Sequence, residues 1–288
     1  MPVLTITHRT EYRYATLVAP GPHRLMLRPR ETPELRLLSF DLLVQPEAAV
    51  TWAHDVSGNS VATAGFSGLA DVLTIESRLT VDLVAPAWPV FDIAASAQHY
   101  PFRYSDEDWI DLGALARPQY VDVAGRLSGW VEGFVMMRPT DTLSLLRDVA
   151  NGVSGRINYQ SREVEGTQGP LETLDRGWGS CRDIAVLFAE AVRTLGFGAR
   201  IVSGYLYVAA SDIVGWTDAG STHAWVEVFV PGAGWIAFDP TNRSVGSANL
   251  IPVAVARHIT QVAPVTGSFH GRSGDLLGMR VEVAVAPA

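Results

Sequence analysis

The chain contains a single cysteine, Cys181, within the stretch GWGSCRDIAVLFAEAVRTLGFGAR at residues 177–200. Ser180 and Asp183 flank it with the spacing of a helix capping box, with Asp in place of the usual Glu. This spacing predicts that Cys181 is the first residue of a helix. Backbone N–H groups there lack partners and carry partial positive charge, so they favour a thiolate and could stabilise an oxyanion. The alternative is a small buried residue that happens to lie near a helix end.

A thiolate nucleophile needs a base, and the base needs an orienting group. Of seven histidines, His223 opens the strand-like stretch STHAWVEVFV, and Asp239 ends the next one, GWIAFDP. A three-residue turn around PGAG would place Asp239 opposite Trp225, one diagonal step from His223, and a five-residue turn gives the same parity. This spacing would bring the carboxylate of Asp239 within reach of an imidazole nitrogen of His223. The alternative is that His223 is a polar residue satisfied at a strand end.

The elements that would position these residues follow from hydrophobic periodicity and turn signals. Short alternating runs separated by Gly and Pro predict an antiparallel β domain at the N-terminus. Thr140 or Asp141 can cap an amphipathic helix of about four turns, whereas residues 161–179 form a polar, glycine-rich connection. The tail is interpreted as mostly coil with short strand pieces. The predicted domains are residues 1–104 (β-sandwich-like), 105–139 (helical connection), 140–245 (core) and 246–288 (C-terminal extension with a closing strand).

Composition limits the class of protein. The 288 residues are 48% hydrophobic, which is enough for a substantial core, and the net charge of −8 argues against nucleic-acid binding. No apolar run reaches the length of a membrane span. The single cysteine needs no oxidising compartment, and MPVLTITHRTEYRY alternates like a strand rather than a signal peptide, which predicts a cytoplasmic protein. The scattered aspartates are not spaced as metal ligands, so neither metal nor cofactor is expected.

Taken together and in this order, the cysteine helix with its ARIVSGYL strand and the stretch STHAWVEVFVPGAGWIAFDPTN resemble the transglutaminase-like core of bacterial proteins, in the papain-like superfamily. The N-terminal stretches ITHRTEYRY, HRLMLRPR and HDVSGNSVATAGF resemble the β domain that precedes this core. Ser57 is a departure, since an aromatic residue usually stands before the Gly-Asn pair. The resemblance covers most of the chain. It implies an α+β fold in which a catalytic helix packs on an antiparallel sheet.

The resemblance implies that Cys181 is the nucleophile, His223 the base and then the acid, and Asp239 the group that orients His223. A thioester would form from an amide carbonyl and be resolved by water in a peptidase or amidase. Resolution by an amine would make the protein an acyltransferase, and a non-catalytic scaffold or binding module is a third alternative. The implied substrate is a protein or peptide. Association with peptide-modifying enzymes is a further expectation.

Four more residues are candidates for substrate contact. Trp178 could line the acyl site or simply pack, and Gly179 would let a substrate approach the backbone closely. Trp225 is expected in the core or in a cleft wall. Tyr205, on the strand that follows the cysteine helix, is expected to border the cleft.

Overall fold

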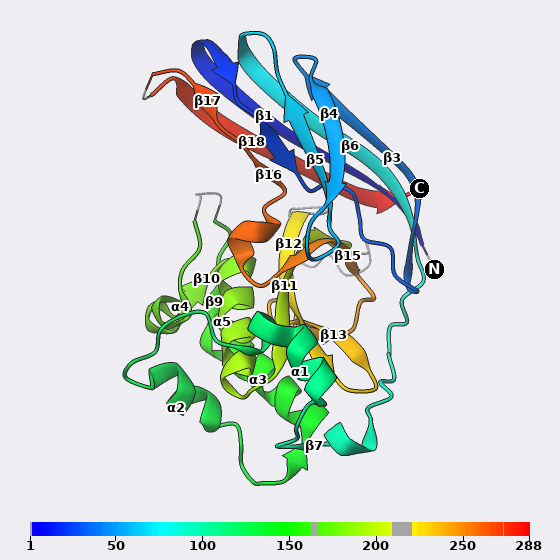
Figure 1. Cartoon of the computed structure of the whole chain (residues 1–288), viewed down its shortest axis with the longest axis vertical. Coiled ribbons are helices and arrows are strands. Elements are labelled where there is room, and N and C mark those ends of the chain that lie inside the picture. Colours follow the sequence, from blue (N-terminus) through cyan, green and yellow to red (C-terminus); the bar gives the residue numbers. More distant parts are fainter. Residues whose placement is uncertain (1, 163–165, 209–220, 273) are drawn as a thin grey trace.

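The computed structural model describes residues 2–162, 166–208, 221–272 and 274–288. A β-sandwich built from both ends of the chain stands above a core of helices packed on a sheet (Figure 1). The sheets are mostly antiparallel, which confirms the α+β class with an N-terminal β domain.

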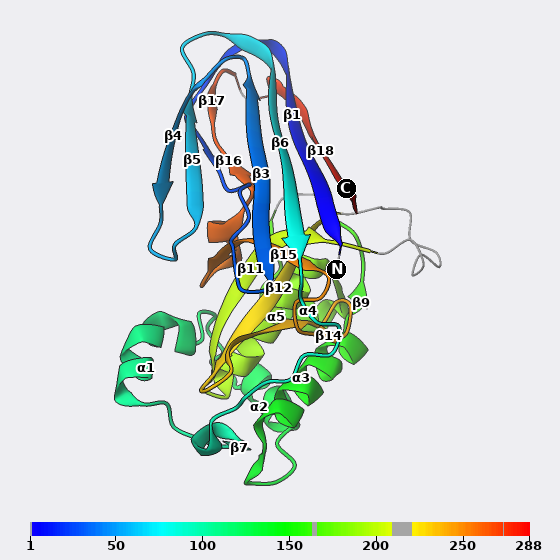
Figure 2. The same ribbon diagram turned by 90° about the vertical axis from the view of Figure 1, so that its right-hand side faces the viewer.

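The sandwich combines a large and a small sheet, seen face to face in Figure 2. The closing strand β18 pairs with β1 from Leu4 opposite Pro287 to Tyr14 opposite Leu276, so the two ends of the chain share one sheet. The large sheet contains β1 (Val3–Pro20), β3 (Leu35–Gln45), β6 (Ala70–Leu83), β17 (Phe269–His270) and β18 (Leu276–Pro287). The small sheet contains β2 (His23–Leu25), β4 (Ala49–His54), β5 (Ser60–Gly65) and β16 (Val265–Thr266).

The core sheet has the order β14-β13-β12-β11-β15, and all its neighbouring strands are antiparallel. Helix α5 (Cys181–Thr194) packs on the face that carries Ile201, Ala224 and Val226, while Val202 and Trp225 belong to a separate apolar cluster. The strands are β11 (Gly198–Leu206), β12 (Ser221–Val230), β13 (Gly234–Asp239), β14 (Ser244–Val245) and β15 (Leu250–Ala256).

The remaining elements surround α5 or connect the two parts of the chain (Figure 1). Helix α3 begins where the sequence predicts, because the Oδ1 of Asp141 accepts a hydrogen bond from the N–H of Ser144 at 2.7 Å. The helices among these remaining elements are α1 (Asp106–Leu112), α2 (Arg126–Glu132), α3 (Thr142–Arg156) and α4 (Pro170–Arg176). The short strands are β7 (His99–Tyr100), β8 (Thr140–Asp141), β9 (Asn158–Tyr159) and β10 (Trp178–Gly179).

Two elements differ from the sequence-based expectation. Helix α4 lies inside the segment interpreted as a polar connection, with Pro170 in its first turn and Gly177 ending it in the left-handed conformation. Strand β15 lies in the tail interpreted as mostly coil, yet it is buried throughout and pairs with β11. The core sheet therefore continues past residue 245, although the domain limits themselves remain predictions.

The sandwich is attached to the core through buried polar contacts as well as apolar packing. The side chain of Asn59 is fully buried and both donates to the carbonyl and accepts from the N–H of Val255, each at 2.8 Å. The Nδ1 of His8 lies 3.0 Å from the hydroxyl of Tyr205. Asn59 belongs to the HDVSGNS stretch, so this motif attaches the sandwich directly to β15.

Candidate active site

Cys181 is the first residue of α5, as the capping pattern predicts. The Oδ2 of Asp183 accepts hydrogen bonds from the N–H and the hydroxyl of Ser180, both at 2.8 Å. Almost every residue of α5 is buried, so the helix and its first turn are fixed by packing. The N-terminus of a buried helix therefore presents its partial positive charge at a half-buried cysteine.

Asp183 also attaches the preceding loop to α5. Its fully buried carboxylate accepts the N–H of Gln168 at 2.7 Å and forms an ion pair with Arg162 at 2.8 Å. One residue earlier, the side chain of Arg182 donates to the carbonyl oxygen of Arg162 at 2.9 Å. The loop after β9 is thereby held against the helix turn that carries Cys181.

The hairpin of β12 and β13 has the register that a three-residue turn requires. Val230 pairs with Gly234, which leaves residues 231–233 as the turn, and Val226 pairs with Phe238. Continuing this register places Asp239 opposite Trp225, next to His223 on the diagonal. The Nε2 of His223 lies 2.8 Å from the Oδ2 of Asp239, and both side chains are buried. The prediction from turn length is confirmed.

Cys181 and His223 form a hydrogen-bonded pair whose ionisation is shifted towards thiolate and imidazolium. Burial raises the pKa of Cys181, but the His223 hydrogen bond and charge, the Ala224 backbone N–H and the charge of Arg182 together bring it below its ordinary value. Burial lowers the pKa of His223, yet the charge and hydrogen bond of Asp239 and the contact with Cys181 raise it to about 10. Since Nε2 faces Asp239, Nδ1 is the ring nitrogen left for the thiol.

Asn242 is a fourth member of this cluster. Its Nδ2 donates to the Oδ2 of Asp239 at 2.7 Å, while its backbone N–H donates to the Oδ1 at 3.3 Å. The N–H of Thr241 donates to the same Oδ1 at 3.1 Å. Burial raises the pKa of the Asp239 carboxyl, but the charge and hydrogen bond of His223, followed by the two hydrogen bonds from Asn242, hold it low. The sequence alone gives Asn242 no role, although its position three residues after Asp239 in the DPTN stretch is a signal for such a contact.

The four predicted substrate-contact residues have different surroundings. Trp178 is partly buried beneath the guanidinium of Arg176, which lies 5.4 Å from its ring centre. A Cβ atom on Gly179 would lie 2.8 Å from the Cβ of Asp183, so packing against α5 already requires this glycine. The ring of Trp225 is buried against that of His223, with centroids 6.1 Å apart. Tyr205 is buried, and its hydroxyl hydrogen-bonds with His8 of the β-sandwich. Its side chain therefore contacts the sandwich rather than an open cleft.

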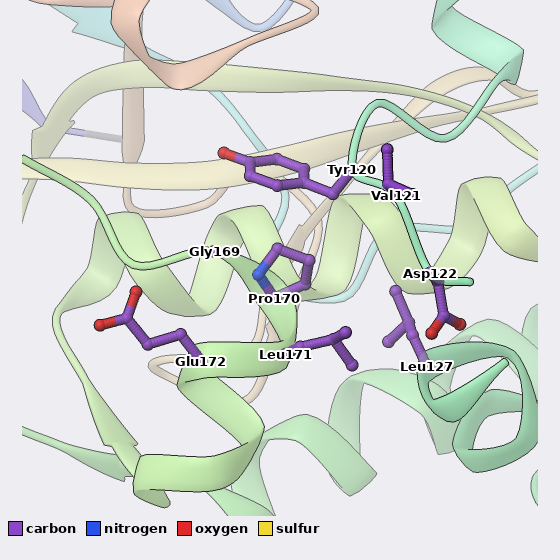
Figure 3. Close-up of a pocket in the computed structure, with 8 residues that line it drawn as sticks. All are labelled: Tyr120, Val121, Asp122, Leu127, Gly169, Pro170, Leu171 and Glu172. Atoms are coloured by element: carbon purple, nitrogen blue, oxygen red, sulfur yellow. The ribbon is translucent and has the colours of Figure 1, made fainter. Parts of the chain in front are cut away.

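A small hollow between α2 and α4 does not include the cysteine cluster. Figure 3 shows the side chains of Tyr120, Pro170, Leu171 and Leu127 around it. The volume of this hollow is about 120 Å³. The Nε2 of His258 lies at hydrogen-bond distance, 3.0 Å, from the hydroxyl of Tyr120. This contact holds the Tyr120 ring in place as one wall of the hollow. None of the predicted catalytic residues lines this space. Within the part of the chain that the structure describes, no group of three or more potential metal ligands is found.

Comparison with protein families agrees with this architecture. Residues 4–82 match the bacterial transglutaminase-like N-terminal region, and residues 130–240 match the transglutaminase-like superfamily. The chain therefore carries a bacterial transglutaminase-like N-terminal region followed by a transglutaminase-like core, and the resemblance seen in its motifs is confirmed.

Individual proteins are also similar to this chain. The uncharacterized protein Rv2569c of Mycobacterium tuberculosis is 28% identical over 298 residues, which cover 98% of this chain and 92% of that protein. The uncharacterized protein ML0607 of Mycobacterium leprae is 37% identical over 113 residues, 39% of this chain and 40% of its own length. The crystal structure of a "Putative Cysteine Protease" from Cytophaga hutchinsonii has a TM-score of 0.75 at 20% identity, covering 100% of this chain and 92% of that one. At this identity the likeness concerns the fold.

No helix in the described ranges is long and apolar enough to cross a bilayer. The cytoplasmic location stays a prediction.

Proposed function

We propose that the protein is a cysteine peptidase or amidase that cleaves peptide or glutamine-type amide bonds through a thioester on Cys181. The observation that carries this proposal is the continuous contact from Cys181 through His223 to Asp239, at the N-terminus of a buried helix. Membership of the transglutaminase-like superfamily supports an enzyme of this class.

The first half of the reaction transfers the acyl group to sulfur. The Cys181 thiolate attacks the amide carbonyl carbon, and the carbonyl π electrons move to oxygen. Backbone N–H groups in the first turn of α5 have no partners within the helix, so they are suited to stabilise the oxyanion. Imidazolium His223 then gives its proton to the amide nitrogen as the C–N bond breaks, which releases ammonia or an amine and leaves a thioester.

The second half restores the enzyme. Neutral His223 takes a proton from water, whose oxygen attacks the thioester carbon. The C–S bond breaks, the carboxylic acid leaves, and the thiolate and imidazolium are regenerated. Asp239 remains ionised throughout and stabilises the imidazolium. An amine in place of water would give the same sequence with a new amide as product, which is the acyltransferase alternative.

The thioester is the test of this function. Because Cys181 is the only cysteine, an acyl adduct detected by intact mass after acid quenching of a glutamine-containing peptide reaction reports on this residue, with Cys181→Ala as the control. We expect an adduct that hydroxylamine removes, followed by the free acid in water. Transfer to an added alkylamine in preference to water would identify an acyltransferase. Absence of both adduct and turnover across a peptide library would favour a binding module.

The expected association with peptide-modifying enzymes is tested separately, by copurification.

A further inference from the structure

A second and larger hollow lies on the side of the core sheet that carries Trp225, away from the apolar cluster of α5. Its volume is about 470 Å³, within the range of small-molecule sites. Trp225, Trp235 and Ala237 line it from the sheet, and residues 86–92, which lead from the sandwich into the core, cross over it. In Figure 2 this connection runs down the core beside β14. None of the residues lining this hollow is Cys181, His223 or Asp239.

The walls of this hollow are largely apolar and aromatic. Two tryptophans, Phe91 and several prolines contribute to them. The connection is held in place by the core: the N–H of Ala94 donates to the carbonyl oxygen of Pro231 at 2.9 Å. A Cβ atom on Gly246 would lie 2.6 Å from the Cγ of Pro89, so this glycine permits the close approach of the connection. The hollow thus lies between segments that are packed against each other.

The sheet side of the hollow is electrically balanced. The Nε of Arg200 lies 2.6 Å from the Oε2 of Glu227, and both side chains are largely buried. The same guanidinium lies over Trp235, 4.2 Å from its ring centre. Arg200 is therefore already paired with a carboxylate and stacked on an aromatic ring, and it offers little attraction to an added anion.

The other two charged lining residues are both acidic. Glu34 and Asp92 line the hollow from the sandwich and from the connection, respectively. Neither carboxylate has a basic group within 4.0 Å among the described residues. Beyond the Arg200–Glu227 pair, the lining of this hollow therefore contains two acidic residues and no second basic one. A ligand complementary to this lining would carry a positive charge on an apolar group.

We propose that this hollow binds a protonated amine carried on an apolar group, such as an arylalkyl ammonium ion. Its apolar part would replace water against the tryptophans and Phe91, and its charge would lie among Glu34, Asp92 and the aromatic rings, which attract cations. This binding needs no chemistry at Cys181, so it stands apart from the proposed function. The occupant would lie against Trp225, whose ring also stacks on that of His223.

The proposal is tested by calorimetric titration of the Cys181→Ala protein at pH 7, which removes acyl transfer from the measurement. The probes are 2-phenylethylammonium, neutral 2-phenylethanol and anionic 3-phenylpropionate. We expect one saturable site for the ammonium ion, with binding at least about tenfold weaker for the alcohol and weakest for the carboxylate, and weakening with salt. Equal affinity for the three probes, or no saturable binding of the ammonium ion, would overturn the proposal.

Variants locate the site. Glu34→Gln with Asp92→Asn should weaken ammonium binding about tenfold or more, whereas the matched pair Glu47→Gln with Asp71→Asn changes exposed carboxylates outside the hollow and should not. Val90 lines the hollow and is 97% exposed, so Val90→Lys supplies a competing ammonium without a packing change and should abolish binding. Equal binding by all these folded variants would contradict the assignment.

Discussion

The Nε2 of His223 lies 2.8 Å from the Oδ2 of Asp239, although the two residues are 16 positions apart in the chain. The turn at residues 231–233 fixes this contact, because a change of one residue in register would send Asp239 to the other face of the sheet. The carboxylate is buried and receives three further hydrogen bonds from Thr241 and Asn242. A charged carboxylate is thus held where an imidazolium would form.

Replacing Asp239 by Asn should remove the charge that favours the His223 imidazolium. The pKa of His223 should fall and that of Cys181 should rise, because each is shifted by its partner. We expect turnover at pH 7 to decrease on the order of 10²–10⁴-fold, the usual contribution of positioned acid–base groups. Asp71→Asn, an exposed carboxylate in the sandwich, is the control. Turnover within twofold of wild type would show that Asp239 has no role in the reaction.

The pH profile of turnover should follow the ionisation of the Cys181–His223 pair. As the pH falls, the thiolate takes up a proton, at a pH below the ordinary thiol pKa because the pKa of Cys181 is lowered. As the pH rises through about 10, His223 loses the proton that the leaving amine needs. Activity should therefore have a plateau through neutral pH, with limbs that belong to the pair as a unit. Initial rates across this range measure it, and a basic limb near pH 6.5 would contradict the raised pKa.

Asn242 should act as a positioning residue through Asp239. Asn242→Ala removes the side-chain donor 2.7 Å from the Oδ2 of Asp239, so the carboxylate is less firmly held against His223 and stabilises its imidazolium less. We expect kcat to fall about tenfold and the basic limb of the pH profile to move to lower pH. Asn249→Ala, at an exposed side chain near β15, should change neither. A loss of stability without a shift of the basic limb would reduce Asn242 to a structural role.

Arg162 should stabilise the first turn of α5. Arg162→Met would deprive the buried carboxylate of Asp183 of one partner, while its bonds to Ser180 and Gln168 remain. The expected loss is about 1–3 kcal/mol in the free energy of unfolding, the cost of an unsatisfied buried acceptor. Arg138→Met breaks an exposed ion pair with Glu132 and should cost less than about 1 kcal/mol. Denaturant titrations of the two variants compare these losses, and equal values would contradict the assignment.

The sequence predicts those parts of the site that depend on short-range rules. Ser180 and Asp183 define the start of α5 because capping is a matter of three residues. The relation of His223 to Asp239 follows from one turn length and the two-residue repeat of strands. The family resemblance then gives these residues their expected roles, and the family itself is confirmed by comparison.

Other features depend on contacts that local patterns do not contain. The ion pair of Arg162 with Asp183 joins residues 21 positions apart across a loop. Strand β15 is buried on both faces, so it lacks the alternation that marks a half-buried strand. Helix α4 did carry signals, since Pro170 and Gly177 have the usual positions of Pro at a helix start and Gly at its end. Its seven residues were too few to show a helical period.

The central claim is that Cys181 is held as a thiolate by His223, and the pH dependence of its alkylation by iodoacetamide tests this most directly. Because no other cysteine is present, the rate reports on one thiol in the wild type and in His223→Ala. We predict an apparent pKa below the reference of ~8.5 in the wild type, rising in the variant. A thiol with an unshifted pKa that is indifferent to the loss of His223 would contradict the proposed enzyme.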